Sequence, residues 1–587
     1  MTGHRFSVWA PDAGGVEVVL GDGRRLGMQP DDQRPSEAPG WWAVEVAEAT
    51  PGTDYGFSLD GGPVRPDPRS MGQPAGPDGL SRLVDTESFP WTDGAWTGAH
   101  LPAGVIYELH IGTFTPDGTF GSAVAKLDHL VDLGVTLVEL MPVAEFPGPR
   151  GWGYDGVDLY APHHHYGGPK GLVELVDACH ARGLGVILDV VYNHLGPAGN
   201  HLGEFGPYFT DRYSTPWGQA LNLDGPGSDE VRRFFIDNAV MWLRDYHFDG
   251  LRLDAVHAIV DTSATHLLEE LSAAVTTLSA QIGRRLFLIA ESDLNDPRVV
   301  TPRMAGGFGM DAQWSDDFHH ALHAVMTGET SGYYSDFGTM EDLATAMRHA
   351  FVYDGRHSRH RRRRHGRRPE GLPGWSFIGY LQNHDQIGNR AVGERSSALM
   401  SPGRLKAAAA VVLCAPFVPM LFQGEEWAAS TPFQYFTSHP DPDLGRAVSE
   451  GRRSEFASFG WDPSDVPGPQ DAATFERSKL DWSELGAPPH DDLLRWHRDL
   501  ISLRRGRPEL TDGRLDSVEV EHGEDWLSLR RGDLVLVLNI GQESWTVPLA
   551  GADARLLLAS EEKVTLSEEG VELPPDSVAV VAIGAIS

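Results

Sequence analysis

The chain has few cysteines, a shortage of basic residues and no long hydrophobic run. Its two cysteines, Cys179 and Cys414, indicate buried apolar side chains in a reducing compartment and not a disulfide framework. The 48 basic residues are outnumbered by 83 acidic ones, and the net charge of −35 argues against a nucleic-acid or anionic-membrane partner. No stretch approaches transmembrane length, and the N-terminus "MTGHRFSVWAPDA" has no basic segment followed by an apolar run. We therefore expect a cytoplasmic protein with a neutral substrate.

The local sequence pattern changes twice along the chain, which predicts three domains. Residues 1–95 contain short alternating segments such as "RFSVWAP" and "WWAVEV", split by Gly and Pro, and this pattern is typical of a small β-sandwich. Residues 96–506 alternate apolar strands with amphipathic helices, which predicts a parallel sheet covered on both sides. Residues 507–587 return to alternating segments such as "DLVLVLNI", which predict an antiparallel β-domain.

The central region contains eight apolar strand segments. They are "VIYELH", "LVELMPV", "GVILDVV", "GLRLDAV", "LFLIAES", "DAQWSDD", "SFIGYL" and "VPMLFQ". Eight such strands favour an α/β fold closed into a (β/α)8 TIM barrel, with insertions after the third and sixth strands. No Gly-rich phosphate-binding fingerprint follows the first strand, so a dinucleotide fold loses support.

A basic segment stands apart from the rest of this acidic chain. Residues 355–371 read "GRHSRHRRRRHGRRPEG" and precede the seventh predicted strand. A basic run invites a nucleic-acid interpretation, but its place in a loop of an acidic chain favours a solvated, mobile insertion.

Three acidic residues occupy the carboxyl ends of three predicted strands: Asp254 in "GLRLDAVH", Glu291 in "LFLIAES" and Asp385 in "YLQNHDQ". A parallel barrel gathers the C-terminal ends of its strands at one mouth, so acids distant in sequence converge there. Paired carboxyl groups are what cleavage of a glycosidic bond requires. Any one of these acids alone would suggest a helix cap or a surface charge, but three together make that interpretation weak.

The neighbours of two of these acids predict different protonation states. Arg252 lies two residues before Asp254 on the same strand, so both side chains share a face and the guanidinium favours the ionised carboxylate. Glu291 ends the apolar run from Leu286 to Ala290, and burial there should raise its pKa and keep it protonated. Asp254 therefore suits a nucleophile, and Glu291 suits a general acid.

Four motifs in order along the barrel, "DVVYNH", "GLRLDAVH", "AES" and "NHD", resemble the α-amylase superfamily, glycoside hydrolase family 13. The resemblance implies Asp254 as nucleophile, Glu291 as acid/base and Asp385 as the third carboxylate, which binds sugar hydroxyls and distorts the bound ring. It implies a retaining mechanism. Residues that it implies in sugar binding are Tyr154, His194, Arg252, His257 and His384.

Within that superfamily, stretches such as "GTFTPDGTF", "QWSDDFHHALH" and "MLFQGEEWAASTPFQYFTSH" look most like the trehalose-releasing members. The implied reaction is hydrolysis of the α-1,4 bond that joins a malto-oligosaccharide to a terminal trehalose, with release of trehalose. Endpoint specificity calls for a closed polar and aromatic pocket. Candidate wall residues, each of which could equally be structural, are Trp217, Asp316, Asp317, Glu425, Gln434 and Tyr435.

Neither a metal nor a cofactor is expected. Asn193 matches a calcium-ligating position of many α-amylases, but the segment after it lacks a cluster of oxygen ligands, so we expect a packing or hydrogen-bonding role. Two alternatives stay open. One is a glycogen branching or debranching enzyme of the same superfamily, and the other is a non-catalytic glucan-binding protein, which would be expected to lack a catalytic carboxylate.

Overall fold

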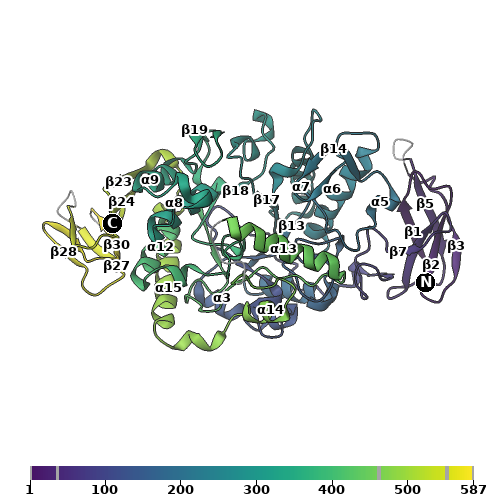
Figure 1. Ribbon diagram of the computed structural model, residues 1–587, viewed down its shortest axis with the longest axis horizontal. Helices are drawn as coiled ribbons and strands as arrows, with labels where there is room; N and C mark the ends of the chain where they lie inside the picture. Colours follow the sequence, from purple (N-terminus) through teal and green to yellow (C-terminus); the bar gives the residue numbers. More distant parts are fainter. Residues whose placement is uncertain (1–2, 35–38, 459–464, 549–553, 585–587) are drawn as a thin grey trace.

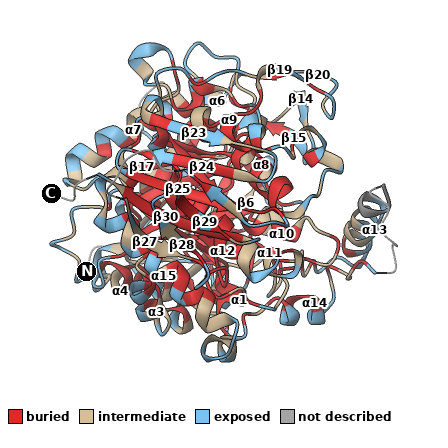
Figure 2. Cartoon of the chain, turned by 90° about the vertical axis from the view of Figure 1, so that its left-hand side faces the viewer, coloured by how far each residue is buried: buried red, intermediate tan, exposed pale blue. Residues whose placement is uncertain are grey.

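The computed structural model describes residues 3–34, 39–458, 465–548 and 554–584, with only the backbone described at 455–458. A parallel barrel occupies the middle of the molecule, and antiparallel β-sheets lie at its two ends (Figure 1). Buried residues occupy the barrel and the C-terminal sheets (Figure 2). None of the described helices combines the length and the hydrophobicity that crossing a bilayer requires.

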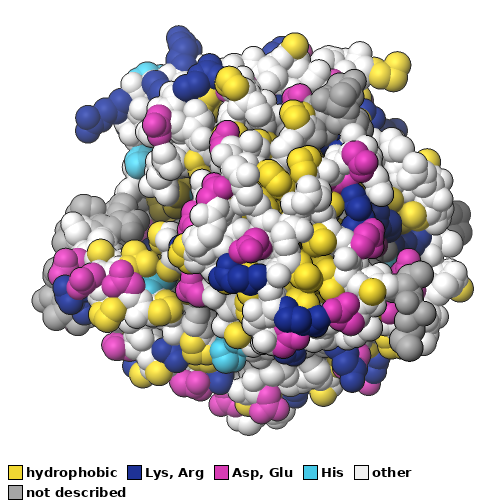
Figure 3. Space-filling view, turned by 90° about the vertical axis from the view of Figure 1, so that its right-hand side faces the viewer, with side chains coloured by type: hydrophobic (Ala, Val, Ile, Leu, Met, Phe, Trp, Pro, Cys, Tyr) yellow, Lys and Arg dark blue, Asp and Glu magenta, His cyan; other side chains and the backbone are white. Residues whose placement is uncertain are grey.

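The N-terminal strands form two antiparallel sheets that pack as a sandwich. Their order is β1-β5-β4 in one sheet and β3-β2-β6-β7 in the other, with β8 also paired to β6. The strands are β1 (His4–Trp9), β2 (Val16–Leu20), β3 (Arg25–Gly27), β4 (Gln29–Pro30), β5 (Trp41–Val46), β6 (Asp54–Leu59), β7 (Val64–Arg65) and β8 (Ser81–Arg82). The sandwich core includes Phe6, Val18 and Phe57, each at most 2% exposed. The outer face at this end carries interspersed acidic and basic side chains (Figure 3).

The eight predicted barrel strands are confirmed, and they close in chain order. They are β9 (Ile106–Leu109), β10 (Leu137–Leu140), β13 (Gly185–Val190), β16 (Gly250–Leu253), β17 (Phe287–Ala290), β18 (Ala312–Trp314), β21 (Phe377–Tyr380) and β22 (Val418–Phe422). All neighbouring pairs are parallel, and β22 pairs with β9 to complete the ring.

The lower part of the barrel interior is apolar. Ile106, Ile187 and Ile289 belong to an apolar cluster separate from the main core, and this cluster draws on seven of the eight strands. The eighth, β16, contributes Gly250 at that level. A Cβ there would lie 2.2 Å from the Phe287 ring, so only glycine fits. Two residues further along the same face, Arg252 points toward the mouth.

Amphipathic helices cover the barrel. The long ones are α4 (Gly168–His180), α6 (Ser228–Arg244), α7 (Leu267–Ile282), α8 (Asp316–Thr327), α9 (Met340–His349), α12 (Pro402–Cys414), α13 (Pro442–Ser458) and α15 (His490–Gly506). Helix α4 buries an apolar stripe that includes Leu172, Val176 and Cys179. Both cysteines are free and buried, as their sequence context predicts.

The insertions after the third and sixth strands each contain a hairpin. Strands β14 (Phe209–Thr215) and β15 (Gly218–Leu221) follow β13, while β19 (Asp354–Ser358) and β20 (Arg363–Gly366) follow β18. The second hairpin contains the basic segment. His365 is buried with its Nε2 2.6 Å from the carbonyl oxygen of Asp293, and Arg361 pairs with the Asp293 carboxylate at 2.9 Å. These contacts anchor two positions of the hairpin, while most of its other basic side chains are exposed, as expected of a solvated insertion.

The C-terminal region is antiparallel, as its alternating pattern predicts. One sheet has the order β23-β24-β25-β30-β27, and a second has the order β26-β29-β28. The strands are β23 (Val518–His522), β24 (Trp526–Arg531), β25 (Leu534–Asn539), β26 (Trp545–Val547), β27 (Ala554–Ala559), β28 (Thr565–Ser567), β29 (Gly570–Leu573) and β30 (Ser577–Ile583). Helix α12 contacts β25 and β30 and so joins these sheets to the barrel.

Candidate active site

The three acids predicted from the strand ends line one cavity of about 350 Å³ at the mouth of the barrel. Asp254 follows β16, and Glu291 follows β17. Asp385 lies in the short helix α10 (His384–Gly388), soon after β21. The closed barrel thus brings together side chains that are up to 131 positions apart in the sequence, because its parallel strands end on the same side.

Arg252 links two of these acids. Its side chain is 1% exposed, with Nη1 at 3.0 Å from Oδ1 of Asp254 and Nη2 at 2.8 Å from Oε2 of Glu291. Nη1 also lies 2.6 Å from Oδ2 of Asp189, and the guanidinium sits 4.0 Å from the centre of the Trp314 ring. Asp254 and Glu291 therefore lie within the reach of a single guanidinium group.

Glu291 has a raised pKa, in the direction that its apolar strand predicts. Burial is the largest cause; Arg252 opposes it, and the negative charge of Asp254 adds to it. The backbone N–H of Ala255 donates to Glu291 Oε2 at 2.8 Å and fixes the orientation of the carboxyl group. Asp254 is held by a different donor, the Nδ2 of Asn193 at 2.7 Å, which gives Asn193 the hydrogen-bonding role expected from the sequence.

Asp385 follows β21, which is separated from β17 by β18 in the barrel, so it reaches the cavity from another part of the mouth than Asp254 and Glu291. Burial raises its pKa, His384 opposes the shift and Glu291 adds to it. Asn389, one helical turn further on, donates from Nδ2 to Asp385 Oδ1 at 2.7 Å. A carboxyl group held in this way can accept or donate hydrogen bonds to sugar hydroxyls.

A chain of hydrogen bonds crosses the floor of the cavity. The hydroxyl of Tyr154 donates to Asp189 Oδ2 at 2.5 Å and lies 2.8 Å from Nε2 of His384. On the far side, Nδ1 of His384 contacts Glu108. Burial lowers the pKa of His384, but the charges of Glu108 and Asp385 and the hydrogen bond to Glu108 together outweigh it, so the net shift is upward. Burial raises the pKa of Asp189 to about 7. His384 in its charged form would donate from both ring nitrogens.

Aromatic rings form the side walls. Trp217, on the β14–β15 hairpin, is 48% exposed and stacks on His194 with ring centres 4.9 Å apart. Nε2 of His194 contacts the carbonyl oxygen of Tyr154 at 3.1 Å. Tyr435 and Trp152 meet edge to face at 5.1 Å, and both line the cavity. Exposed flat rings beside carboxyl groups suit the apolar faces and hydroxyl edges of a sugar.

Two further predicted residues lie at or near the cavity. His257 lines it, 4.0 Å from Asp293. Asp316 is half-buried and accepts a hydrogen bond from the Tyr380 hydroxyl at 2.5 Å. Burial, with the charge of Glu291, raises the pKa of Asp316 to about 7.

Asp317 does not line the cavity, which corrects its assignment as a wall residue. Its Oδ2 accepts the backbone N–H groups of Val352 and Tyr353, each at 2.7 Å, and the Nδ2 of Asn295 at 2.8 Å. Asp317 is 3% exposed and holds the chain after helix α9 in place. The adjacent Asp316 points toward the site because successive residues of helix α8 face different directions.

Glu425 and Gln434 are the other two corrections. Glu425 lines a different, nearly filled cavity, where its Oε2 accepts the backbone N–H of Phe422 at 3.3 Å. Nε2 of Gln434 donates to the carbonyl of Val392 at 3.0 Å and is therefore committed to the backbone. Both side chains are turned away from the sugar-binding cavity by local hydrogen bonds that no strand-end pattern reveals.

Several cavity residues were missed by the sequence reasoning. Trp152 and Asp155 flank Tyr154 in "GWGYDG", and Asn389 follows Asp385 by one helical turn. Their closeness in sequence to predicted site residues is the signal that could have identified them. Arg452 comes from helix α13 and donates from Nη1 to Asn389 Oδ1 at 3.0 Å. Nothing in its surrounding sequence indicated the site.

Two protein-family models match parts of the chain. The family model "Alpha amylase, catalytic domain" matches residues 84–205, and the model "Domain of unknown function (DUF3459)" matches residues 513–580. The first match spans β9, β10 and β13 and includes the motif "DVVYNH".

Relatives named malto-oligosyltrehalose trehalohydrolase match almost the whole chain. The protein from Arthrobacter ramosus is 52% identical over 584 residues, which cover 99% of this chain and 100% of that one. The Mycobacterium tuberculosis protein is 48% identical and covers 98% of each chain. The chain belongs to the malto-oligosyltrehalose trehalohydrolase family. A more distant relative from Saccharolobus solfataricus is 43% identical, over 90% of this chain and 89% of its own.

Solved structures share the fold of this chain. A Salmonella typhimurium protein, described provisionally as an alpha amylase, superposes with a TM-score of 0.89 at 39% identity, covering 98% of this chain and 97% of that one. A pullulanase from Paenibacillus barengoltzii has a TM-score of 0.73 at 21% identity, covering 99% and 94%, and shares the fold. The superfamily resemblance carried by the four motifs is thereby confirmed.

Proposed function

We propose that this protein is a glycosidase that hydrolyses the α-1,4-glucosidic bond next to the terminal trehalose of maltooligosyl trehalose and releases trehalose. The observation that carries the proposal is Arg252, buried and in contact with both Asp254 and Glu291 at the mouth of the barrel. A carboxyl group with a raised pKa and a second carboxyl group beside one sugar-sized cavity are what a retaining glycosidase needs. Full-length similarity to proteins named malto-oligosyltrehalose trehalohydrolase supports the choice of substrate.

The two carboxyl groups take different roles in the first step. Asp254, which accepts hydrogen bonds from Arg252 and Asn193, attacks the anomeric carbon of the malto-oligosaccharide. Glu291, whose raised pKa keeps its proton available, donates that proton to the oxygen of the departing trehalose as the C–O bond breaks. The product of this step is a glycosyl ester on Asp254.

Water completes the reaction. Glu291, now ionised, takes a proton from a water molecule, and the resulting oxygen attacks the anomeric carbon and releases Asp254. Two inversions at one carbon give net retention, so the malto-oligosaccharide emerges as the α-anomer. The proton removed from water restores Glu291 for the next cycle.

The remaining cavity residues position the sugar. Asp385 and His384 are placed to bind hydroxyl groups of the ring whose bond is cleaved, and Tyr154 offers its ring face beside them. Trp217, exposed on its hairpin, offers a second platform. A buried site that hydrogen-bonds a substrate hydroxyl discriminates strongly against ligands that lack it. Such a site favours recognition of a sugar dimer without a reducing end.

The test is substrate choice. The protein is incubated separately with maltotriosyl trehalose, maltopentaose and amylopectin, and free trehalose, shortened malto-oligosaccharides and branch content are measured. We expect rapid release of trehalose from the first substrate and much slower cleavage of the others. Rapid shortening of maltopentaose, or a change in the branching of amylopectin, without trehalose release from maltotriosyl trehalose would contradict the proposal. The Asp254→Asn variant, prepared and assayed in parallel, measures the background from contaminating glucosidases, which is then subtracted.

A further inference from the structure

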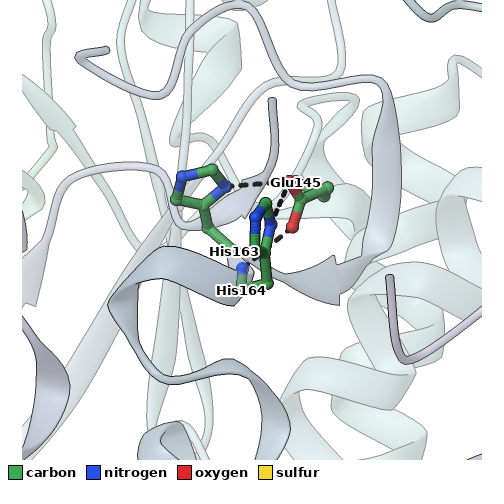
Figure 4. A group of neighbouring side chains, drawn as sticks. All are labelled: Glu145, His163 and His164. Carbon is green, nitrogen blue, oxygen red and sulfur yellow. Dashed lines mark hydrogen bonds and ion pairs between the residues drawn. The ribbon is translucent and has the colours of Figure 1, made fainter. Parts of the chain in front are cut away.

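A run of three histidines, His163 to His165, follows the strand β12 (Asp158–Pro162) and takes no part in the proposed reaction. Two of them, His163 and His164, converge on Glu145 of the short strand β11 (Ala144–Glu145) (Figure 4). The side chains of Glu145 and His163 are fully buried, and that of His164 is about one quarter exposed.

The three side chains have the composition and spacing of a metal site. Nδ1 of His163 lies 3.0 Å from Glu145 Oε1, and Nδ1 of His164 lies 2.9 Å from the same oxygen. One ligand atom from each of the three residues lies within 4.8 Å of the other two. Imidazole nitrogen and carboxylate oxygen bind zinc at about 2.0–2.2 Å in tetrahedral geometry, which places ligand atoms about 3.4 Å apart. Small side-chain shifts would therefore admit an ion.

A fourth residue, Asp158, gives an independent indication that positive charge belongs here. It stands directly opposite Glu145 in the β11–β12 pair, so the two carboxyl groups share one face of the ribbon. Asp158 is 5% exposed, and within the described parts of the chain its Oδ2 has no hydrogen-bond partner. A buried carboxyl group without a partner is costly, and a nearby cation would offset that cost.

We propose that Glu145, His163 and His164 bind a divalent transition-metal ion, zinc being the best fit to this ligand set, with Asp158 beside it as counter-charge or as a further ligand through water. Two nitrogens and one carboxylate leave the fourth tetrahedral position open for that water. None of its three residues lines the sugar cavity, and the site supplies no step of the proposed reaction.

Its place in the fold indicates what the ion would do. Strands β11 and β12 are the two ends of the loop 146–157, and this loop carries Trp152, Tyr154 and Asp155 into the sugar cavity. An ion held by Glu145 on one strand and by the histidines just after the other closes the base of that loop. Bound metal therefore stabilises the folded protein and the cavity wall together.

The test uses zinc chloride on the full-length protein. After dialysis against a chelator and then against metal-free buffer at pH 7.5, the protein is titrated with zinc, and bound zinc is counted by elemental analysis after gel filtration. We expect one zinc per chain and a rise in Tm of about 2 °C or more at saturating zinc. Cobalt(II) in place of zinc should give the visible absorption bands of a tetrahedral nitrogen and oxygen site.

Three variants separate this site from adventitious binding. His164→Ala, at a partly exposed position, and Glu145→Gln, of unchanged shape, should each lose the bound zinc and the rise in Tm. His165→Ala is the matched control, because His165 lies in the same run but outside the ligand group, and it should bind zinc like the wild type. If Glu145→Gln does not fold, His164→Ala and the cobalt spectrum still decide the matter.

The opposing outcomes are distinct. No uptake of zinc by the wild type at micromolar concentrations would overturn the proposal. Glu145 would then be only a hydrogen-bond acceptor for the imidazole rings of His163 and His164. Uptake that survives His164→Ala and Glu145→Gln, or that His165→Ala abolishes, would place the ion elsewhere and would equally overturn it. Trehalose release is measured separately, so failure of the metal site leaves the proposed glycosidase activity standing.

Discussion

Replacing Tyr154 by phenylalanine separates its hydroxyl group from its aromatic ring. The hydroxyl bridges Asp189 and His384 at 2.5 and 2.8 Å, and Asp189 also contacts Arg252, which holds both proposed catalytic acids. Tyr154→Phe therefore disturbs the electrostatics under the reacting sugar while leaving the stacking surface intact.

The expected size of the effect follows from these two contacts. Hydrogen bonds to charged groups contribute about 1.5–3 kcal/mol each, and since one hydroxyl makes both, about 3 kcal/mol is a fair value for the pair. Expressed in the transition state, that is a decrease in kcat/KM of about 100-fold, at about 1.4 kcal/mol per factor of ten. The decrease should appear mainly in kcat, because the ring still binds the sugar. Tm should fall by only a few degrees in a chain of this length.

The assay is the initial rate of trehalose release from maltotriosyl trehalose across a range of substrate concentrations. A matched control is Tyr55→Phe in the N-terminal sandwich, where a buried tyrosine hydroxyl contacts the Asp67 carboxylate at 2.7 Å. It should lower Tm to a similar extent and leave kcat unchanged. A Tyr154→Phe enzyme within about twofold of the wild-type kcat/KM would refute the bridging role, and an equal loss in the control would show a general effect on folding.

Three further outcomes are expected. Asp254→Asn and Glu291→Gln should each lower turnover by several orders of magnitude with an unchanged circular dichroism spectrum, since each removes one of the two groups that the reaction needs; near-normal turnover in either variant would exclude that residue from the chemistry. Trp217→Ala should raise KM about tenfold with a smaller change in kcat, because stacking of a sugar contributes about 1–1.5 kcal/mol; an unchanged KM would remove Trp217 from the binding surface. Burial raises the pKa of Glu425 from 4.5 to about 8, so the contribution of its protonated form to the stability of the fold is complete below pH 4.5 and is lost as the pH rises toward 8. Glu425→Gln is neutral at every pH, so it should flatten the decrease in Tm between about pH 5 and 9 and leave activity at pH 7 unchanged. A wild-type slope of Tm against pH in that variant would contradict the assigned protonation.

Much of the barrel could be predicted from the sequence because its strands obey simple rules. Each strand is an apolar run, and the two-residue period places Arg252 and Asp254 on one face, which the contact at 3.0 Å confirms. Burial of the run before Glu291 gives the correct direction for its pKa. The roles of these residues in catalysis and the domain boundaries at 95 and 506 stay predictions.

The loops were harder to predict because tertiary contacts, and not local pattern, decide where their side chains point. Asp316 and Asp317 are adjacent, yet only Asp316 turns toward Glu291, while Asp317 accepts backbone N–H groups of a later segment. Arg452 reaches the cavity from helix α13, which does not directly follow a barrel strand, so the rule that site residues follow strand ends does not predict it. The carbonyl of Asp293 that anchors the basic hairpin is more than 70 residues from His365, so no local pattern reveals this attachment.

The configuration of the first-formed product tests the proposed chemistry most directly. Proton NMR recorded within seconds to minutes of adding enzyme to maltotriosyl trehalose distinguishes the α- and β-anomers of the new reducing end before they equilibrate. Covalent catalysis by Asp254 with Glu291 as acid and base predicts the α-anomer first. A β-anomer appearing first would mean direct attack by water and would contradict the role of Asp254 as nucleophile.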